Sequence, residues 1–178
     1  MRHQLRTVDL TAAERHPPIV ENGLRTLAWT SEQDSAVFAA RLAAHPAIAN
    51  CFIELRGELG AGKTTLVRHI LRALGVQGRI KSPTYAVVEP YVLRLAQEQR
   101  ELSIWHFDFY RFSDPREWED AGFRDLFASP GLKLAEWPEN AGALLPKADL
   151  VVRIGVRADD TRDVTLTAQT PAGLELLR

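Results

Sequence analysis

The glycine-rich segment at residues 57–64, Gly-Glu-Leu-Gly-Ala-Gly-Lys-Thr, constrains the fold of this chain more than any other segment. It matches the full pattern GxxxxGK followed by Ser or Thr, which builds a phosphate-binding loop where it joins a strand to a helix. The compact apolar run of residues 50–55 is typical of a buried strand. Apolar residues then recur at helical spacing from Lys63 to Leu74, and Gly75 ends the pattern. The sequence therefore predicts a strand, a phosphate loop and a helix in succession.

The residue types in this loop suit triphosphate chemistry. Glycine at positions 57, 60 and 62 permits positive φ angles and lets backbone N–H groups approach phosphate oxygens. The helix that begins near Gly62 adds the positive end of its dipole. Lys63 would place a charge between the terminal phosphates, and the hydroxyl of Thr64 would take one position around an octahedral Mg²⁺. The alternative is a glycine-rich turn with a solvated lysine. We expect a nucleoside triphosphate site.

The loop specifies neither the base nor the reaction, because kinases, GTPases and ATPases all use it. A guanine-binding protein would be expected to carry Asn/Thr-Lys-x-Asp downstream. The nearest approach is residues 146–149, Pro-Lys-Ala-Asp, which has proline where the amide or hydroxyl should be. Guanine specificity is therefore not expected.

Two carboxylates are candidates for holding Mg²⁺, because each ends or nearly ends a predicted strand. Asp108 follows the apolar residues 104–107, and Glu136 follows residues 132–135. Either could instead be a surface carboxylate. His106 lies between Trp105 and Phe107, where a packed or hydrogen-bonded histidine is the simpler interpretation, and we assign it no chemistry.

Residues 81–85, Lys-Ser-Pro-Thr-Tyr, lie between the helix after the phosphate loop and the next predicted strand. Many nucleotide switches carry a hydroxyl that senses the γ-phosphate at this position, which makes Thr84 the candidate. A proline turn with a hydroxyl capping a strand is the alternative.

The remaining pattern predicts more strands than helices. A strand at Leu24–Trp29 precedes an Ala-rich helix that a capping box at Thr30 and Gln33 would open and that would run to about His45. Later strands are predicted at 85–92, 102–109, 132–136, 150–156 and 164–168, with a short helical stretch at 114–127. Because few helices are available as crossovers, we expect an α/β, P-loop NTPase-like fold of three layers around a mixed parallel and antiparallel sheet.

Composition and patterning indicate a single globular domain. Residues 1–22 show no clear period and read as an N-terminal extension, residues 23–170 as the ATPase-like domain, and residues 171–178 as a C-terminal tail. The single Cys51 excludes a disulfide framework or zinc cluster and is consistent with a reducing compartment. No apolar run is long enough to span a bilayer. We expect a cytoplasmic protein with no membrane partner.

A formal charge of −1 does not suggest a protein that coats DNA or another polyanion. The balance hides an asymmetry, since residues 56–100 hold eight basic and three acidic side chains whereas residues 101–140 hold four basic and nine acidic ones. One stretch could receive an anion and the next could supply carboxylates to a cation, although solvated helix faces of biased sign would give the same counts.

Four ordered segments together resemble the bacterial TsaE family, also called YjeE, the ATPases of tRNA threonylcarbamoyladenosine biosynthesis. The segments are residues 57–65, 81–85 with 88–91, 106–111, and 136–139. The resemblance spans about residues 24–168. It implies a small P-loop ATPase that uses ATP and Mg²⁺ and works with the TsaB–TsaD pair, which carries out the transfer to tRNA. ATP hydrolysis would reset that complex between rounds, and contact with tRNA would be indirect.

The resemblance also implies roles for individual residues. Lys63 and Thr64 would serve the phosphates and Mg²⁺, Glu136 would be a magnesium carboxylate, Thr84 would lie in a switch-like loop, and Asp108 would be needed for hydrolysis. Lys63, Asp108 and Thr84 form the expected catalytic set. The expected nucleotide-binding set is Gly57, Gly60, Ala61, Gly62, Lys63, Thr64, Thr65 and Arg162.

Two alternative functions stay open at this point. A small P-loop kinase would pass the γ-phosphate to a metabolite and would need an arginine-bearing lid. The stretch from Arg94 to Arg100 is the best candidate for a lid, but it reads better as an ordinary connection between strands. A nucleotide-regulated binding module, in which the ATP-bound shape alone recruits a partner, is the other alternative.

Overall fold

The computed structural model describes residues 23–95 and 100–178 of the 178-residue chain. The predicted extension at residues 1–22 and part of the candidate lid at 96–99 lie outside the described residues. Within the described ranges, no helix combines the length and the apolar character that crossing a membrane requires.

A seven-stranded mixed sheet forms the centre of the protein, in the order β1-β7-β6-β2-β5-β4-β3. Strands β6, β2, β5 and β4 run parallel, whereas β1, β7 and β3 pair antiparallel with their neighbours. This arrangement confirms the expected mixed sheet. The strands are β1 Leu24–Trp29, β2 Phe52–Arg56, β3 Val88–Leu95, β4 Arg100–Asp108, β5 Leu132–Glu136, β6 Leu150–Val156 and β7 Arg162–Ala168.

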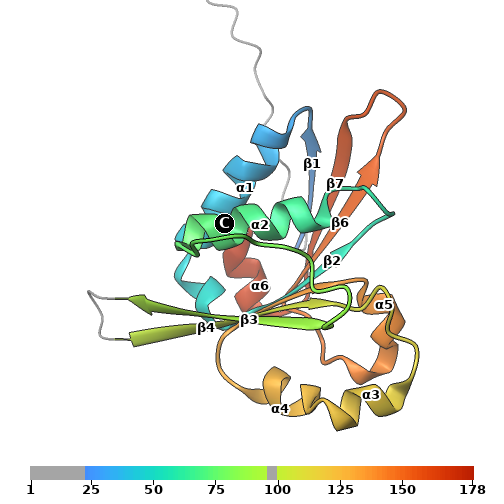
Figure 1. Ribbon diagram of the computed structural model, residues 1–178. Helices are drawn as coiled ribbons and strands as arrows, with labels where there is room; N and C mark the ends of the chain where they lie inside the picture. The colour runs from blue at the N-terminus through green and yellow to red at the C-terminus, as the bar shows by residue number, and fades with distance from the viewer. Residues whose placement is uncertain (1–22, 96–99) are drawn as a thin grey trace, which may run out of the picture.

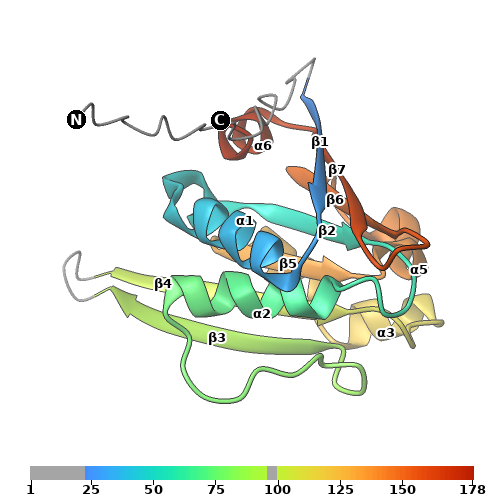
Figure 2. The same cartoon turned by 90° about the horizontal axis from the view of Figure 1, so that it is seen from above.

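Helices cover both faces of the sheet and complete the predicted three layers (Figure 1). Figure 2 shows α1 and α2 side by side above the sheet, and 3₁₀ turns η1 and η2 connect helices to strands. The helices α3, α4 and α5 lie on the opposite face. The elements are α1 Glu32–Ala44, η1 Pro46–Asn50, α2 Lys63–Leu74, α3 Pro115–Asp120, α4 Phe123–Ala128, α5 Pro138–Ala141, η2 Gly142–Leu144 and α6 Pro171–Leu176.

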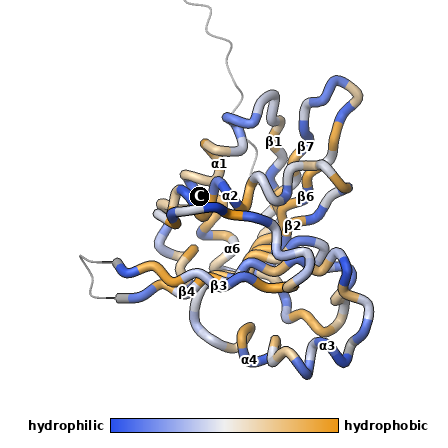
Figure 3. Tube along the Cα trace, in the orientation of Figure 1, coloured by the Kyte–Doolittle hydropathy of each residue, from blue (hydrophilic) through white to orange (hydrophobic). Residues whose placement is uncertain are grey.

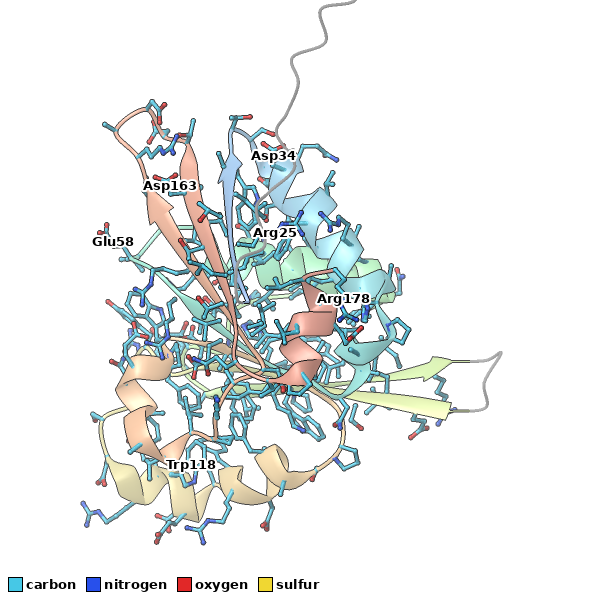
Figure 4. The ribbon with its side chains drawn as sticks, turned by 180° about the vertical axis from the view of Figure 1, so that it is seen from behind. Arg25, Asp34, Glu58, Trp118, Asp163 and Arg178 are labelled. Carbon is cyan, nitrogen blue, oxygen red and sulfur yellow. The ribbon has the colours of Figure 1, made fainter. Side chains whose placement is uncertain are left out.

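Each face of the sheet has its own apolar core, because side chains of a strand alternate between faces. Ile53 of β2 packs with the α1 and α2 side chains, whereas the neighbouring Phe52 packs with Trp118 and Phe123 of α3 and α4. Figure 3 shows the apolar segments concentrated along the sheet and polar ones in the turn between β6 and β7. Figure 4 shows Trp118 among the side chains of the α3–α4 layer.

Several element boundaries differ from the sequence expectations for local reasons. The helix α1 has Ser31 as its N-cap, and the carboxylate of Asp34, rather than Gln33, accepts hydrogen bonds from the Ser31 and Thr30 amides at 3.1 and 2.8 Å. The predicted helical stretch at 114–127 is two helices, because Gly122 adopts a φ of 68° between them.

The ends of the last elements also differ from expectation. Strand β7 begins at Arg162 instead of residue 164, since Arg162 pairs with both Val156 and Trp29. The segment assigned to a tail contains α6, whose N-cap Thr170 accepts a hydrogen bond from the Gly173 amide at 3.2 Å.

Candidate functional site

The predicted phosphate loop connects β2 to α2, and its glycines adopt the conformations that the pattern requires. The φ angles are +145° at Gly57, +80° at Gly60 and +110° at Gly62, the N-cap of α2. Gly57 also needs space, because a Cβ there would lie 2.3 Å from the Ile154 carbonyl oxygen of β6. The other two glycines have open space around them, so only backbone conformation selects glycine there.

Lys63 is held close to the loop that precedes it. Its Nζ donates hydrogen bonds to the carbonyl oxygens of Gly57 at 2.7 Å and Glu58 at 2.8 Å, and it lies 3.9 Å from the centroid of the Trp137 ring. Burial lowers the pKa of Lys63, and the charges of Glu136, Glu139 and Asp108 oppose that shift. A largely buried ammonium group beside carboxylates is thus positioned at the start of α2.

Thr64 and Glu136 meet at the ends of α2 and β5. The Thr64 hydroxyl lies 3.0 Å from Oε1 and 2.8 Å from Oε2 of Glu136, whose side chain is almost fully buried. A hydroxyl and a carboxylate oxygen are ligands that suit Mg²⁺, which uses one or two carboxylates together with phosphates and water. In the part of the chain that the structure describes, no cluster of three His, Cys, Asp or Glu residues could hold a metal by itself. The Thr64 hydroxyl and the Glu136 carboxylate are thus groups that could hold Mg²⁺ together with phosphate and water.

Asp108 ends β4 beside Glu136, because the two residues are partners in the parallel register of β4 and β5. Its Oδ2 accepts hydrogen bonds from the hydroxyls of Ser82 and, at 2.9 Å, Thr84. Its Oδ1 accepts one from the Tyr110 amide at 3.0 Å. These donors fix a buried carboxylate whose side chain lines the cleft.

A strained turn brings the two hydroxyls to Asp108. Val87 adopts a φ of +66°, which is rare for a β-branched residue. Its amide donates to the Pro83 carbonyl at 2.7 Å, and its own carbonyl accepts from the Asp108 amide at 2.8 Å. Because this turn occupies the preceding residues, β3 begins at Val88 rather than at the predicted residue 85. The turn places the Ser82 hydroxyl against Asp108. The sequence did not single out Ser82, although it lies two residues before Thr84.

The start of α2, the segment with Ser82 and Thr84, and the ends of β4 and β5 line one cleft of about 320 Å³. It brings together most of the predicted residues, namely Gly60, Gly62, Lys63, Thr64, Thr65, Thr84, Asp108 and Glu136. Leu59, Tyr110 and Trp137, which the sequence analysis did not assign to the site, also line it. The Glu136-Trp-Pro-Glu segment was the available signal for Trp137, whose φ of +56° turns the chain over Lys63.

Two predicted residues lie beside this cleft instead of in it. Ala61 and Arg162 line an adjoining cleft of about 230 Å³, together with Trp29 and Glu32 on the other side of the phosphate loop. The Arg162 Nε donates a hydrogen bond to the Ala61 carbonyl oxygen at 3.1 Å. Gly57 lines neither cleft and packs beneath the loop against β6.

Comparison with known proteins bears on the fold and on the family of the chain. A solved structure, the crystal structure of Bacillus subtilis YdiB, superposes with a TM-score of 0.65 at 25% sequence identity and covers 86% of this chain and 93% of that chain. Two relatives carry the name tRNA threonylcarbamoyladenosine biosynthesis protein TsaE. The Haemophilus influenzae protein is 45% identical over 70% of this chain and 75% of its own length. The Bacillus subtilis protein is 32% identical over 82% of this chain and 87% of its own length.

The family model described as threonylcarbamoyl adenosine biosynthesis protein TsaE matches residues 29–164, a range that includes the phosphate loop and both carboxylates. With this match and these relatives, the chain belongs to the TsaE family.

Proposed function

We propose that this protein binds ATP with Mg²⁺ and hydrolyses it, as the ATPase subunit of the machinery that makes threonylcarbamoyladenosine in tRNA. One observation carries the proposal. Lys63 and Thr64 at the start of α2 share a single cleft with Asp108 and Glu136, which end two adjacent parallel strands. Ligands of open α/β sheets bind at the carboxyl ends of parallel strands, and phosphoryl transfer requires this combination of groups.

The chain supplies the groups that hold a triphosphate. The loop amides and Lys63 would bind the β- and γ-phosphate oxygens, for which Lys63 would leave the carbonyl oxygens of Gly57 and Glu58. The Thr64 hydroxyl and Glu136 would hold Mg²⁺. When bound there, the ion would neutralise charge that develops on the phosphates during transfer.

Asp108 is the residue that we assign to the attacking water. Its carboxylate is fixed by Ser82, Thr84 and the Tyr110 amide at the rim of the same cleft. A carboxylate held in one orientation can accept a hydrogen bond from water and direct the oxygen toward the γ-phosphate. Thr84 would sense the γ-phosphate through its hydrogen bond to Asp108. If its hydroxyl moved, Asp108 would lose that donor.

The adjoining cleft supports a nucleoside rather than inorganic triphosphate. It begins at the phosphate loop and is lined by Glu32 and Arg162, with the largely buried Trp29 behind them. A guanidinium can stack on a base, and a carboxylate can accept hydrogen bonds from ribose hydroxyls. We assign the base and sugar of ATP to this cleft.

The rim of the phosphate cleft supports a protein partner. Leu59 is 76% exposed and Tyr110 45%, and both line the cleft, while Tyr85, 85% exposed, directly follows Thr84 in sequence. Exposed apolar side chains around a polar site are typical of interaction surfaces. We propose that the TsaB–TsaD complex covers this rim, that hydrolysis resets the complex between turnovers in the cytoplasm, and that contact with tRNA is indirect.

The test is ATP turnover, measured as inorganic phosphate release, with and without purified TsaB–TsaD. We expect TsaB–TsaD to bind and to raise turnover. Lys63→Ala and Thr64→Ala should reduce turnover at least about 100-fold, since each removes charge or metal stabilisation of the transition state. Lys147→Ala is the matched control, because Lys147 is exposed and far from the cleft.

Three outcomes would contradict the proposal. If Lys63→Ala and Thr64→Ala both hydrolysed ATP at the wild-type rate, the cleft would not be the site of hydrolysis. If the protein did not bind TsaB–TsaD and its ATP turnover did not change, TsaB–TsaD would not be its partner. Phosphate transfer to a metabolite would favour a kinase, for which the structure offers little support, since Arg94 belongs to β3 and pairs with Glu101 of β4 at 3.3 Å.

A further inference from the structure

His106 lies two residues before Asp108 on β4, and its side chain is completely buried. Because alternate residues of a strand share a face, His106 lies on the same face of the sheet as Asp108 and as Glu136 of β5. Its Nε2 lies 2.8 Å from Oε1 of Glu136. This contact connects a core residue directly to the carboxylate that we assign to Mg²⁺.

Glu136 needs a donor besides Thr64. The Thr64 hydroxyl carries one proton, so it cannot donate to both Oε1 and Oε2, although it lies within 3.0 Å of each. An ionised carboxylate with an unsatisfied oxygen is costly at 2% exposure. His106 satisfies Oε1, which leaves Oε2 for Thr64 and for the cleft.

The other ring nitrogen defines the form of His106 that fits. Among the described residues, Nδ1 is buried and has no hydrogen-bond partner. A carboxylate only accepts, so Nε2 must carry the proton that is donated to Glu136. The contact therefore places the donated proton on Nε2, while Nδ1 has no acceptor for a proton among the described residues.

We propose that His106 is a positioning residue, which holds Oε1 of Glu136 so that Oε2 is presented to Mg²⁺ beside Thr64. The inference rests on the proposed function, since it assigns His106 a task only if Glu136 binds the ion. Hydrogen-bond donors behind a metal-binding side chain commonly change metal affinity by 10- to 100-fold when removed.

Two amide substitutions separate positioning from packing. In His106→Gln the side-chain amide nitrogen can reach the place of Nε2, whereas in His106→Asn it reaches only the place of Nδ1 and falls short of Glu136. Both variants bury a polar amide, but the shorter Asn leaves a larger void at this fully buried position. A role limited to packing would therefore lower the basal melting temperature, more in His106→Asn, and leave the Mg²⁺-dependent increment of both variants unchanged.

The measurement is the rise in melting temperature caused by ADP with Mg²⁺ over that caused by ADP with EDTA. We expect His106→Gln to retain most of this Mg²⁺-dependent increment and His106→Asn to lose it, with apparent Mg²⁺ affinity lowered about 10- to 100-fold. Stabilisation by ADP with EDTA should be the same in both variants. The Mg²⁺ dependence of ATP turnover should shift in the same order.

The result that overturns the inference alone is an equal Mg²⁺-dependent increment in wild type, His106→Gln and His106→Asn. If instead wild type gains no stability from ADP with or without Mg²⁺, while its melting remains cooperative, the proposed function fails and takes the inference with it. The wild-type response to ADP distinguishes the two failures.

Discussion

Individual glycines in the two loops that flank α2 are required for different physical reasons. Gly57 lies where β2 meets β6, and any side chain there would contact the Ile154 carbonyl. Gly78, in the loop after α2, also has a positive φ of +83°, but a Cβ added there would meet no atom within 4 Å. One glycine is required by conformation and space together, the other by conformation alone.

This difference predicts unequal effects on stability. Gly57→Ala should lower the free energy of unfolding by at least about 3 kcal/mol, because backbone strain and the collision with Ile154 add together. Gly78→Ala should cost about 1 kcal/mol, the penalty for a left-handed conformation alone. Urea denaturation followed by circular dichroism measures both. Equal losses would show that the Ile154 carbonyl moves aside at little cost.

At the scale of elements, hydrogen bonds of Thr170 and Asp149 attach the final helix, α6, to the sheet. The Thr170 hydroxyl accepts from the Gly173 amide and also donates to Oδ1 of Asp149, just before β6. The other oxygen of Asp149 accepts a hydrogen bond from the Phe52 amide at the start of β2, at 2.7 Å. The cap of α6 thus belongs to the same network as the first residue of the strand that leads to the phosphate loop.

The cap predicts the effect of removing one hydroxyl. Thr170→Ala should destabilise the protein by roughly 1–2 kcal/mol, since α6 loses its N-cap and Asp149 loses a donor. Thr170→Ser keeps the hydroxyl and should stay within about 0.5 kcal/mol of wild type. Chemical denaturation of the three proteins provides the comparison. A loss in the serine variant as large as that in alanine would assign the effect to the methyl group.

At the scale of the molecule, the sheet joins two cores into one structure. Trp29 belongs to the core beneath α1 and α2, and Trp118 to the core beneath α3 and α4. Strand β2 supplies Ile53 to the first core and Phe52 to the second. Neither core can separate from the other while the strands stay paired.

We therefore expect both cores to unfold together. Fluorine NMR of protein labelled with fluorotryptophan can follow the Trp29 and Trp118 signals separately through a urea titration. Coincident midpoints are expected, because loss of either core removes the side chains that cover one face of β2 and β5. Separate midpoints would show two cooperative units. Assignment by single Trp→Phe substitutions controls the identity of each signal.

The uneven distribution of charge along the chain is also explained by the fold of the whole molecule. Lys63 comes from the basic stretch at residues 56–100, whereas Asp108 and Glu136 come from the acidic stretch at 101–140. The fold brings these three side chains into one cleft. A nearly neutral total charge therefore includes a lysine and carboxylates that are adjacent in space although far apart in sequence.

The sequence by itself determined the features that depend on local chemistry. The conformation of the glycine-rich loop at residues 57–62, the helix α2 and the strands β5 and β6 were predicted closely, because glycine conformations and apolar periodicity act over a few residues. The four segments shared with the TsaE family identified the candidate residues. The boundary errors at β3 and α1 arose from a strained turn at Val87 and a cap displaced by one residue.

Only the tertiary structure decided which of these residues touch. Thr64 and Glu136 are 72 positions apart, and His106 and Glu136 are 30 apart. Their contacts depend on the placement of β4 beside β5 and of α2 above both, an order that period-two patterning cannot specify. For that reason Ser82, Trp137 and the Nε2 of His106 acquire their places in the site only when the strands are assembled.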